Sequence, residues 1–433
     1  MYRDSKSGFK AAYHTLGCKL NFSETSAIGH ALRERGVRNA EAGEHPDIIV
    51  VNTCSVTEMA DKKGRNLIRS LHRRHPDAAI VVTGCYAQLK PGEVSSIPGV
   101  EIVLGAGEKL RAAEFVTRWL DERRRVCRTT PSRDIREFVP TCESGDRTRW
   151  FLKVQDGCDY FCTYCTIPYA RGRSRSGNIA ELVRMAEEAA GHGAREIVIT
   201  GVNIGDFGRD NGQSFFDLIR ALDMVEGIDR YRISSIEPNL LTDEIIDWCA
   251  ESRAFMPHFH IPLQSGSDHV LKMMNRRYGT ELFAERIEHI RRVMPQAFIG
   301  VDVIAGARGE TQEEWLRARD FIESLPVTRL HVFPYSERPG TAALKLPDPV
   351  EPRLRHERVA ELIDISDRKL AAFLDRQVGS RASVLWESTR HDDGTIQGFT
   401  ENYVRIQAPW DDSLPNAITP VTVSAENIVP NQG

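Results

Sequence analysis

Hydrophobic residues in the first 140 positions form short continuous runs that are separated by polar, helix-like stretches. Three of these runs cover residues 11–16, 47–53 and 79–83, and turn-forming residues bound each of them. Apolar runs of this length that alternate with charge-bearing helical patterns are typical of βαβ units in a parallel sheet. We therefore predict an N-terminal domain over residues 1–140 that is built on an open parallel α/β sheet.

A second alternating region follows a polar stretch over residues 122–145, which we interpret as a linker. Helical patterns such as 179–191 and 312–325 separate its apolar runs. The predicted strands cover residues 151–154, 196–200, 231–236, 258–263, 298–304 and 330–333. Six strands that alternate with helices predict a partial (β/α)6 barrel over residues 145–375, smaller than the eight-stranded barrel.

The hydrophobic pattern changes again toward the C-terminus. One long amphipathic helix is predicted over residues 352–376, and three short β-rich pieces follow at 382–386, 403–406 and 420–423. Turn signals such as Asp393-Gly394 lie between these pieces. The pattern predicts a small OB-like β-barrel over residues 376–433, so the expected fold class is α/β with three domains.

Composition narrows the class of protein. Of the 433 residues, 41% are hydrophobic and 27% are charged, as in soluble globular proteins. No apolar run approaches the roughly 20 residues that cross a bilayer, and the charged start leads into no signal-peptide core. We therefore expect a cytoplasmic protein with no membrane partner. The net charge of −4 gives no general electrostatic reason to expect a nucleic-acid partner.

The nine cysteines change this picture. A disulfide framework is not expected in a cytosolic chain of this length, so closely spaced cysteines are better interpreted as metal or redox ligands. Cys18, Cys54 and Cys85 each follow a predicted strand. Because binding sites form at the carboxyl ends of parallel strands, their three thiols can converge at one edge of the sheet.

A second group, Cys158, Cys162 and Cys165, has the spacing C-x3-C-x2-C directly after the first strand of the second region. A structural zinc site normally has four protein ligands, and the next Cys or His downstream is His192. Three thiolates with an open position suit an iron-sulfur cluster instead; three unrelated buried cysteines are the alternative. The cysteines outside both groups are interpreted as structural or incidental: Cys127, Cys142 and Cys249.

The spacing of the second group resembles that of the radical S-adenosylmethionine enzymes. This resemblance implies that Cys158, Cys162 and Cys165 hold a 4Fe-4S cluster whose free iron binds S-adenosylmethionine. It also implies that Tyr164 lies against the adenine of that cofactor. A cluster with an open iron supplies both the electron and the chelation site that cleavage of a sulfonium bond needs.

The blocks around the upstream cysteines narrow the family. Together with Glu24, several blocks resemble the methylthiotransferases: residues 16–21, 51–57, 82–85, 155–158, 167–172, 261–267 and 334–341. This resemblance implies that Cys18, Cys54 and Cys85 hold a second 4Fe-4S cluster. It also implies that residues 376–433 form a TRAM domain, which is an OB-like RNA-binding module.

Four short blocks, at residues 17–21, 200–205, 234–238 and 274–278, resemble the MtaB-type branch of the family. That branch methylthiolates C2 of N6-threonylcarbamoyladenosine next to the anticodon of tRNA. The implied reaction uses two S-adenosylmethionine molecules, one as methyl donor and one as the source of the 5′-deoxyadenosyl radical. It also requires an electron donor such as flavodoxin or ferredoxin, whereas the sulfur donor is not identified by the sequence.

Two other functions are also compatible with the sequence. A sibling methylthiotransferase would act on isopentenyladenosine in tRNA or on a ribosomal protein. A protein of another class would be a non-catalytic, metal-stabilised RNA-binding protein in which both cysteine triads are structural. The absence of a nearby fourth protein ligand beside each triad favours the enzyme over the structural role.

The ends of the predicted barrel strands supply the expected cofactor contacts, since sites lie at the carboxyl ends of barrel strands. These residues are Gly201, Asn203, Ser235, Glu237, Gln264, Ser265 and Val303. Ser235 and Val303 are equally compatible with a role in the core. The reaction needs no Ser-His-Asp set, so no catalytic side chain is predicted.

Three arginines alternate just after the cluster loop. Arg171, Arg173 and Arg175 are predicted to bind substrate, through the carboxylate of the cofactor or the phosphates of tRNA. The alternative is a solvated, arginine-rich turn.

Two stretches depart from the pattern of the family. Residues 306–310 read Gly-Ala-Arg-Gly-Glu, where the family usually has Gly-Phe-Pro-Gly-Glu. Residues 376–433 carry four arginines, no lysine and seven acidic residues, although an RNA-binding module is expected to be basic. Either these arginines cluster on one face, or much of the affinity for tRNA comes from the other domains.

Overall fold

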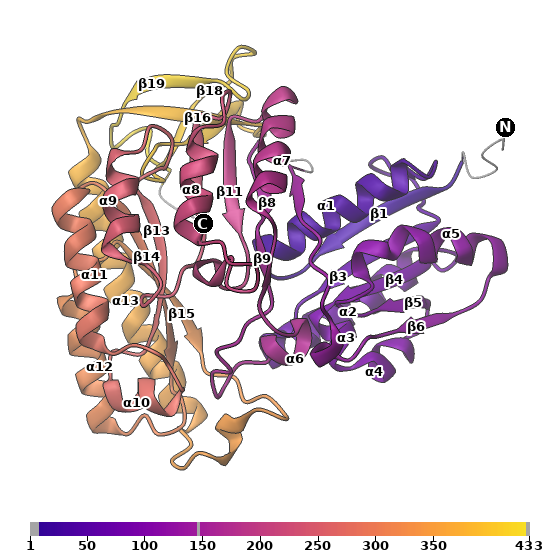
Figure 1. The fold of residues 1–433 in the computed structure, drawn as a ribbon, viewed down its shortest axis with the longest axis horizontal. Helices are drawn as coiled ribbons and strands as arrows, with labels where there is room; N and C mark the ends of the chain where they lie inside the picture. The colour runs from indigo at the N-terminus through magenta and orange to yellow at the C-terminus, as the bar shows by residue number, and fades with distance from the viewer. Residues whose placement is uncertain (1–7, 145–147, 430–433) are drawn as a thin grey trace.

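In the computed structural model, which describes residues 8–144 and 148–429, the N-terminal unit lies beside a barrel-like unit (Figure 1). The N-terminal unit contains one parallel sheet with the strand order β2-β1-β3-β4-β5-β6. Its strands are β1 (Lys10–Thr15), β2 (Arg38–Asn39), β3 (Ile48–Thr53), β4 (Ala79–Gly84), β5 (Val100–Leu104) and β6 (Val126–Arg128). The open parallel sheet predicted from the sequence is therefore confirmed.

Helices cover both faces of this sheet, which explains why β3 and β4 are buried along their whole length. Ile48 and Val50 face a core formed with α1 (Lys19–Arg33) and α5 (Ala112–Glu122). Ile49 and Val51 alternate with them and face a second core on the other side. The helices on that side are α2 (Glu58–Arg74), α3 (Cys85–Leu89) and α4 (Pro91–Ser95), and the 3-10 turn η1 (Lys109–Arg111) precedes α5.

The second unit contains all six predicted barrel strands. They are β8 (Trp150–Lys153), β11 (Glu196–Thr200), β12 (Arg230–Ile233), β13 (His258–Gln264), β14 (Phe298–Ala305) and β15 (Arg329–Pro334). Neighbouring strands pair in parallel within two sheets, β12-β11-β8 and β13-β14-β15. A parallel bridge between Ser235 and His260 joins the two sheets, so the partial barrel is confirmed.

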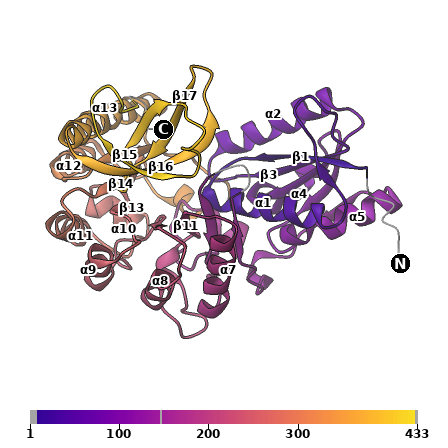
Figure 2. The same cartoon turned by 90° about the horizontal axis from the view of Figure 1, so that it is seen from above.

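Helices surround the outside of this barrel (Figure 2). They are α7 (Ile179–Gly191), α8 (Phe215–Asp223), α9 (Asp243–Glu251), α11 (Thr280–Val293), α12 (Gln312–Ser324) and α13 (Pro352–Gln377). The loops at the carboxyl ends of the strands carry β9 (Gln155–Asp156), α6 (Ile167–Arg171), β10 (Arg175–Ser176), η3 (Ile204–Asp206), α10 (Asp268–Met273) and η4 (Ala342–Lys345). In the described part of the chain, none of the helices has the length and apolar character needed to span a membrane.

The C-terminal unit is a four-stranded antiparallel sheet that lies over one end of the barrel (Figures 1 and 2). Its strands are β16 (Arg381–Arg390), β17 (Thr395–Phe399), β18 (Arg405–Pro409) and β19 (Ile418–Thr422), in the order β18-β17-β16-β19. Arg230 donates to the carbonyl oxygens of Phe399 and Ser383 at 2.9 and 2.8 Å. These hydrogen bonds hold the sheet against the amino ends of the barrel strands.

The stretch interpreted as a linker over residues 122–145 is more ordered than predicted, and that interpretation is wrong for its described part. It contains β6, which extends the N-terminal sheet, the turn η2 (Ser132–Asp134), and β7 (Thr141–Glu143), which pairs antiparallel with β8. Strands of three residues are too short to give a hydrophobic period, so backbone pairing alone defines them. Gly145 lies outside the described residues.

Candidate functional site

The first cysteine triad gathers at one edge of the N-terminal sheet. Cys18 precedes α1, Cys54 follows β3 and Cys85 begins α3 directly after β4. The strands β1, β3 and β4 are neighbours, so these three positions lie at the same carboxyl edge. Burial raises the pKa of Cys54 to about 12, and the nearby thiols of Cys85 and Cys18 act in the same direction.

Two glycines allow this close approach. Gly17 has a φ of +107°, and a Cβ at this position would lie 2.8 Å from the Cβ of Cys54. Gly84 has a φ of +95°, and a Cβ there would lie 2.3 Å from the carbonyl oxygen of Thr53. Both positions therefore require glycine. The amide of Asn21 fixes the same edge by donating to the carbonyl oxygens of Leu16 and Thr53, at 2.8 and 3.2 Å.

The second triad lies in the loop between β9 and α6. Each of its sulfurs accepts one hydrogen bond: Cys158 from the Tyr160 N–H (3.4 Å), Cys165 from the Ile167 N–H (3.4 Å) and Cys162 from the Arg276 guanidinium (3.1 Å). Such bonds stabilise thiolate ligands and tune the potential of an iron-sulfur cluster. Burial raises the pKa of Cys158 and of Cys165 to about 12, so cluster binding would release their protons.

Arg276 is a site residue that sequence reasoning did not single out, although it lies within one of the blocks that carry the family resemblance. Its guanidinium contacts the Cys162 sulfur, the Tyr278 hydroxyl (3.0 Å) and the Glu237 carboxylate. The sequence predicts a cofactor contact at Glu237, and the structure places it in this partly buried ion pair. Burial raises the pKa of Glu237, while Arg276 opposes that shift.

Gln155 connects the cluster loop to two of the predicted cofactor contacts. Its side-chain oxygen accepts the N–H groups of Val202 (2.9 Å) and Asn203 (2.8 Å), and its amide donates to the Gly157 carbonyl oxygen (2.7 Å). A Cβ at Gly201 would lie 2.9 Å from the Gln155 carbonyl oxygen. The buried Oδ1 of Asn203 has no hydrogen-bond partner among the described residues, which leaves an acceptor available to a bound molecule.

The remaining predicted contacts lie near the carboxyl ends of the barrel strands. Ser235 forms the bridge to His260, and Gln264 ends β13 with a φ of +69°. The Ser265 hydroxyl is buried and accepts the Ser267 N–H at 3.3 Å. Two side chains pack against apolar groups: Val303 in the barrel core, and Tyr164 against the cluster of Val270, Met274, Ala307, Tyr335 and Ala343.

Of the three predicted substrate-binding arginines, Arg173 alone is exposed. Its side chain is 60% exposed and pairs with Asp159 at 3.3 Å. Arg171 is 2% exposed and binds Asp156 (2.9 Å), Glu24 (3.1 Å) and the Asn21 side-chain oxygen (2.6 Å). Arg175 is also buried, at 3.3 Å from Asp156. The partners of these two arginines are therefore protein carboxylates that the sequence pattern did not reveal.

Arg171 belongs to a buried ion network between the N-terminal unit and the barrel. The network contains four cations and two carboxylates: Lys109, Lys153, Arg171, Arg175, Glu24 and Asp156. Burial alone would raise the pKa of Glu24, but Arg171, Lys109 and Lys153 outweigh it and hold the pKa well below its usual range. Burial raises the pKa of the Cys85 thiol, and the nearby Arg171 and Lys109 oppose that shift.

A second contact between the units explains the block at residues 334–341. The buried Arg338 donates to the Ser55 hydroxyl (2.8 Å) and to Asp61 (2.9 Å). Ser55 directly follows Cys54, and its carbonyl oxygen accepts the Thr166 hydroxyl at 3.2 Å, one residue after Cys165. Each triad is therefore followed by a residue that contacts the opposite unit.

The arginine of the loop that departs from the family pattern bonds to other residues of the barrel unit. Arg308 donates to Glu337 at 2.8 Å and to the Leu346 carbonyl oxygen at 3.0 Å, whereas Ala307 packs in the cluster that contacts Tyr164. Arg308 also lines a groove of about 980 Å³ between the start of α2 and the end of β15. Two exposed apolar side chains, Met59 (58%) and Phe333 (47%), lie in this groove.

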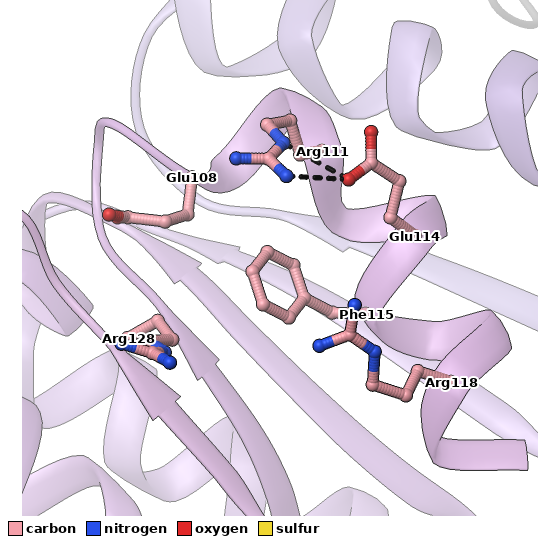
Figure 3. A pocket seen from close by; sticks show the side chains of 6 residues that line it. All are labelled: Glu108, Arg111, Glu114, Phe115, Arg118 and Arg128. Carbon is pink, nitrogen blue, oxygen red and sulfur yellow. Dashed lines mark hydrogen bonds and ion pairs between the residues drawn. The ribbon is translucent and has the colours of Figure 1, made fainter.

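A separate pocket of about 270 Å³ lies on the N-terminal unit, beside η1 and α5 (Figure 3). Its lining residues are Glu108, Arg111, Glu114, Phe115, Arg118 and Arg128. The exposed Arg111–Glu114 pair spans 2.8 Å. The pocket includes no member of either triad and none of the predicted contacts.

Three cysteines belong to neither triad. Cys142 and Cys249 are core residues, and Cys127 is exposed on β6.

Two family models match this chain. Residues 10–105 match the uncharacterized protein family UPF0004, and residues 152–322 match the radical SAM superfamily. The chain is 37% identical to the threonylcarbamoyladenosine tRNA methylthiotransferase MtaB of Bacillus subtilis, over 98% of this chain and 95% of that relative. The chain belongs to the radical SAM methylthiotransferase family. The family expected from the cysteine blocks is thus confirmed.

Other methylthiotransferases show the same coverage. The MtaB protein of Thermotoga maritima is 36% identical over 90% of this chain and 89% of its own length. The tRNA-2-methylthio-N(6)-dimethylallyladenosine synthase of Pelotomaculum thermopropionicum is 30% identical over 95% of this chain and 94% of its own. Among solved structures, the radical S-adenosylmethionine methyltransferase TsrM of Kitasatospora setae aligns with a TM-score of 0.56 at 17% identity, covering 75% of this chain and 72% of that one. That likeness shows the fold alone.

The residues of this methylthiotransferase fit the 4Fe-4S clusters and S-adenosylmethionine of its family. Each triad offers three thiols, as a cluster with an open iron requires. Asn203 presents an unpartnered buried acceptor, and the cation excess beside Cys85 suits an anionic, thiolate-bound cluster. Within residues 8–144 and 148–429, no three His, Cys, Asp or Glu side chains are grouped as ligands of a single metal ion.

Proposed function

We propose that this methylthiotransferase adds a methylthio group to C2 of N6-threonylcarbamoyladenosine beside the anticodon of tRNA, in the cytoplasm. Relatives named for this nucleoside are 34–37% identical over at least 90% of the chain. Relatives named for dimethylallyladenosine are 29–31% identical over similar lengths. The closer likeness favours the threonylcarbamoyl substrate over the isopentenyl one.

The observation that carries this proposal is the placement of two cysteine triads on two units that buried ion pairs hold together. We infer that Cys158, Cys162 and Cys165 hold the cluster that binds S-adenosylmethionine, and that the other triad holds the auxiliary cluster. Arg171 supports this assignment, because it follows Cys165 by six residues and donates to Asn21, three residues after Cys18, at 2.6 Å. Transfer of a group to one base requires that the two cofactors be held at a fixed separation.

When bound, the clusters and S-adenosylmethionine supply the electron, the hydrogen abstraction and the methylthio group that reaction at C2 needs. The side chains of the protein position and shield these groups. Gln155 orders the cluster loop, Asn203 offers an acceptor to the cofactor, and the Arg276–Glu237 pair fixes Cys162. Burial of these contacts keeps water away from the reacting atoms.

The groove at the start of α2 is the surface by which we infer that the RNA approaches. Phe333 and Met59 present apolar faces for bases. Both basic and acidic side chains line the same groove: Lys63, Arg308, Arg355, His356, Glu58, Glu337 and Glu351. Aromatic side chains with nearby cations are typical of surfaces that bind single-stranded RNA. Such a surface would supply affinity that the acidic C-terminal unit, our proposed TRAM domain, lacks. An external flavodoxin or ferredoxin would donate the electron.

The proposal is tested by nucleoside mass spectrometry of tRNA from a strain that lacks the protein and is then complemented. Wild-type protein should restore 2-methylthio-N6-threonylcarbamoyladenosine. The Cys162→Ala variant should abolish cleavage of S-adenosylmethionine and product formation. The Cys54→Ala variant should retain cleavage but form no product, because only sulfur insertion depends on the auxiliary triad.

Cys127→Ala is the matched control, since Cys127 is exposed on β6 and belongs to neither triad; it should behave as wild type. The substrate assignment fails if the methylthio nucleoside is present without the protein or never appears with it. Product formation by the Cys54→Ala variant would refute the auxiliary role of that triad.

A further inference from the structure

Lys19 is the residue directly after Cys18. It is exposed, and its side chain lines a small cavity between the N-terminal unit, the barrel and the C-terminal unit. The other residues that line this cavity include Arg149, Arg232, His258 and Tyr403.

The groups that face Lys19 make this cavity electropositive. Arg232 is paired with Glu196 at 2.9 Å, and Arg149 donates to the Tyr403 hydroxyl at 2.8 Å and reaches Glu387 at 3.4 Å. Burial acts to raise the pKa of Tyr403, but Arg149, Lys19 and Arg232 outweigh it and lower the pKa.

The same charges contribute to the lowered pKa values of two nearby histidines. Burial, Arg232 and Lys19 lower the pKa of His258 well below its usual value. Burial and the neighbouring His260 lower the pKa of His331 to about 4, with a smaller contribution from Lys19, while Asp302 opposes the shift. Both rings are therefore neutral at physiological pH. The Asp302 carboxylate pairs with the His260 ring at 2.7 Å, so it does not neutralise Lys19.

Lys19 is the cation of this cavity that lacks a counter-charge. In the part of the chain that the structure describes, no hydrogen bond or ion pair engages its ammonium group, and the nearby Glu196 is already paired. Two arginines, Arg149 and Arg232, line the same cavity, so its electrostatic potential favours an anion. A bound anion would supply the counter-charge that Lys19 lacks.

We propose that Lys19 binds the free carboxylate of the threonylcarbamoyl group and so selects substrates whose N6 substituent ends in an anion. This inference rests on the proposed function. Threonine is attached through its amine in this nucleoside, so its carboxylate stays ionised, whereas an isopentenyl group is uncharged. Specificity then has two sources. Lys19 attracts the carboxylate of the threonylcarbamoyl group, and an isopentenyl group would place a hydrocarbon beside an ammonium group that stays unpaired.

The size and position of the cavity suit the end of such a substituent. Its volume is about 80 Å³, several times the roughly 10–15 Å³ that one water needs but too small for a nucleoside. Lys19 directly follows Cys18, so the cavity that it lines adjoins the loop that carries the first triad. On this proposal, a base presented to the first triad places its N6 substituent toward Lys19.

The test measures binding of anticodon stem-loop RNA to anaerobic holoenzyme without S-adenosylmethionine, by fluorescence anisotropy. One RNA carries N6-threonylcarbamoyladenosine, and a second carries the same group with its carboxylate converted to a carboxamide. Wild type should prefer the carboxylate by about tenfold or more, as for a charge-assisted hydrogen bond. Lys19→Met should abolish that preference and bind the carboxamide RNA as wild type does. Lys19→Arg should retain part of it.

Lys62→Met is the control, because Lys62 is exposed on α2; it should keep the full preference. The inference is overturned if Lys19→Met still prefers the carboxylate, or if this variant loses iron, which would assign Lys19 to the cluster. Failure of the proposed function is a separate outcome: wild-type holoenzyme with S-adenosylmethionine and reductant would then modify an isopentenyladenosine RNA and not the threonylcarbamoyl RNA.

Discussion

Arg171 contacts residues of both α/β units, and it shares the Glu24 carboxylate with two lysines. Glu24 accepts from Arg171, Lys153 and Lys109, all of which are 2% exposed. Removing one partner of a buried ion pair leaves the others unpaired and costs more free energy than the pair contributes. Glu24 is therefore the position where a single substitution most directly loosens the contact between the units.

We predict that Glu24→Gln lowers the free energy of unfolding by about 3–5 kcal/mol. The pKa of Glu24 in the folded protein lies below its unfolded value of about 4.3. Its contribution is thus fully present above about pH 5 and is lost as the pH falls further. Urea unfolding of the anaerobic holoenzyme should show a large gap between variant and wild type at pH 7 that narrows toward pH 3.

The control is Glu114→Gln, since Glu114 pairs with Arg111 on the surface (Figure 3). That variant should change the unfolding free energy by less than about 1 kcal/mol. An equal loss for both variants, or a gap that widens on acidification, would contradict the role assigned to Glu24.

At the scale of elements, the start of α2 and the end of β15 define the groove through which we infer that RNA approaches. Both segments are held by buried contacts to the opposite unit, through Asp61 on α2 and Arg338 after β15. The Glu58 N–H also donates to the Ser336 hydroxyl at 3.1 Å. Phe333 therefore extends from a fixed support, which favours stacking over a mobile contact.

We predict that Phe333→Ala weakens binding of a tRNA anticodon stem-loop by about 5- to 100-fold, because stacking of one base on an aromatic ring is worth about 1–3 kcal/mol. Filter binding or anisotropy with holoenzyme measures the effect, and iron content should not change. Leu316→Ala, which removes a partly exposed side chain on α12, should bind as wild type. Unchanged affinity of the Phe333 variant would place the RNA elsewhere.

The long elements and the convergence of the first triad were predictable because they depend on local patterns. Buried runs end at Cys54 and Cys85, and parallel strands bring such ends together whatever the rest of the chain does. The ion network was not predictable, since Glu24 and Arg171 are 147 positions apart and no periodicity relates them. The sequence pattern accordingly predicts a substrate contact at Arg171, and no local pattern distinguishes Lys19 from the other residues of its block.

At the scale of the whole molecule, the two triads predict the metal content. Anaerobically prepared holoenzyme should contain about eight irons and eight sulfides per chain, that is, two 4Fe-4S clusters. Replacing Cys18, Cys54 and Cys85 together by alanine should leave about four irons, as should replacing Cys158, Cys162 and Cys165. Bound zinc without sulfide would instead indicate structural sites and a non-catalytic protein.

The contact between Arg171 and Asn21 has a further consequence for the assembly of the enzyme. It joins the loops that carry the two triads through one buried guanidinium group. Through this contact, insertion of one cluster can change the free energy of inserting the other. That change is the same whichever cluster is inserted first, because linkage between binding events is reciprocal. A favourable coupling would make the maturation of the enzyme favour chains with both clusters or neither over half-loaded intermediates.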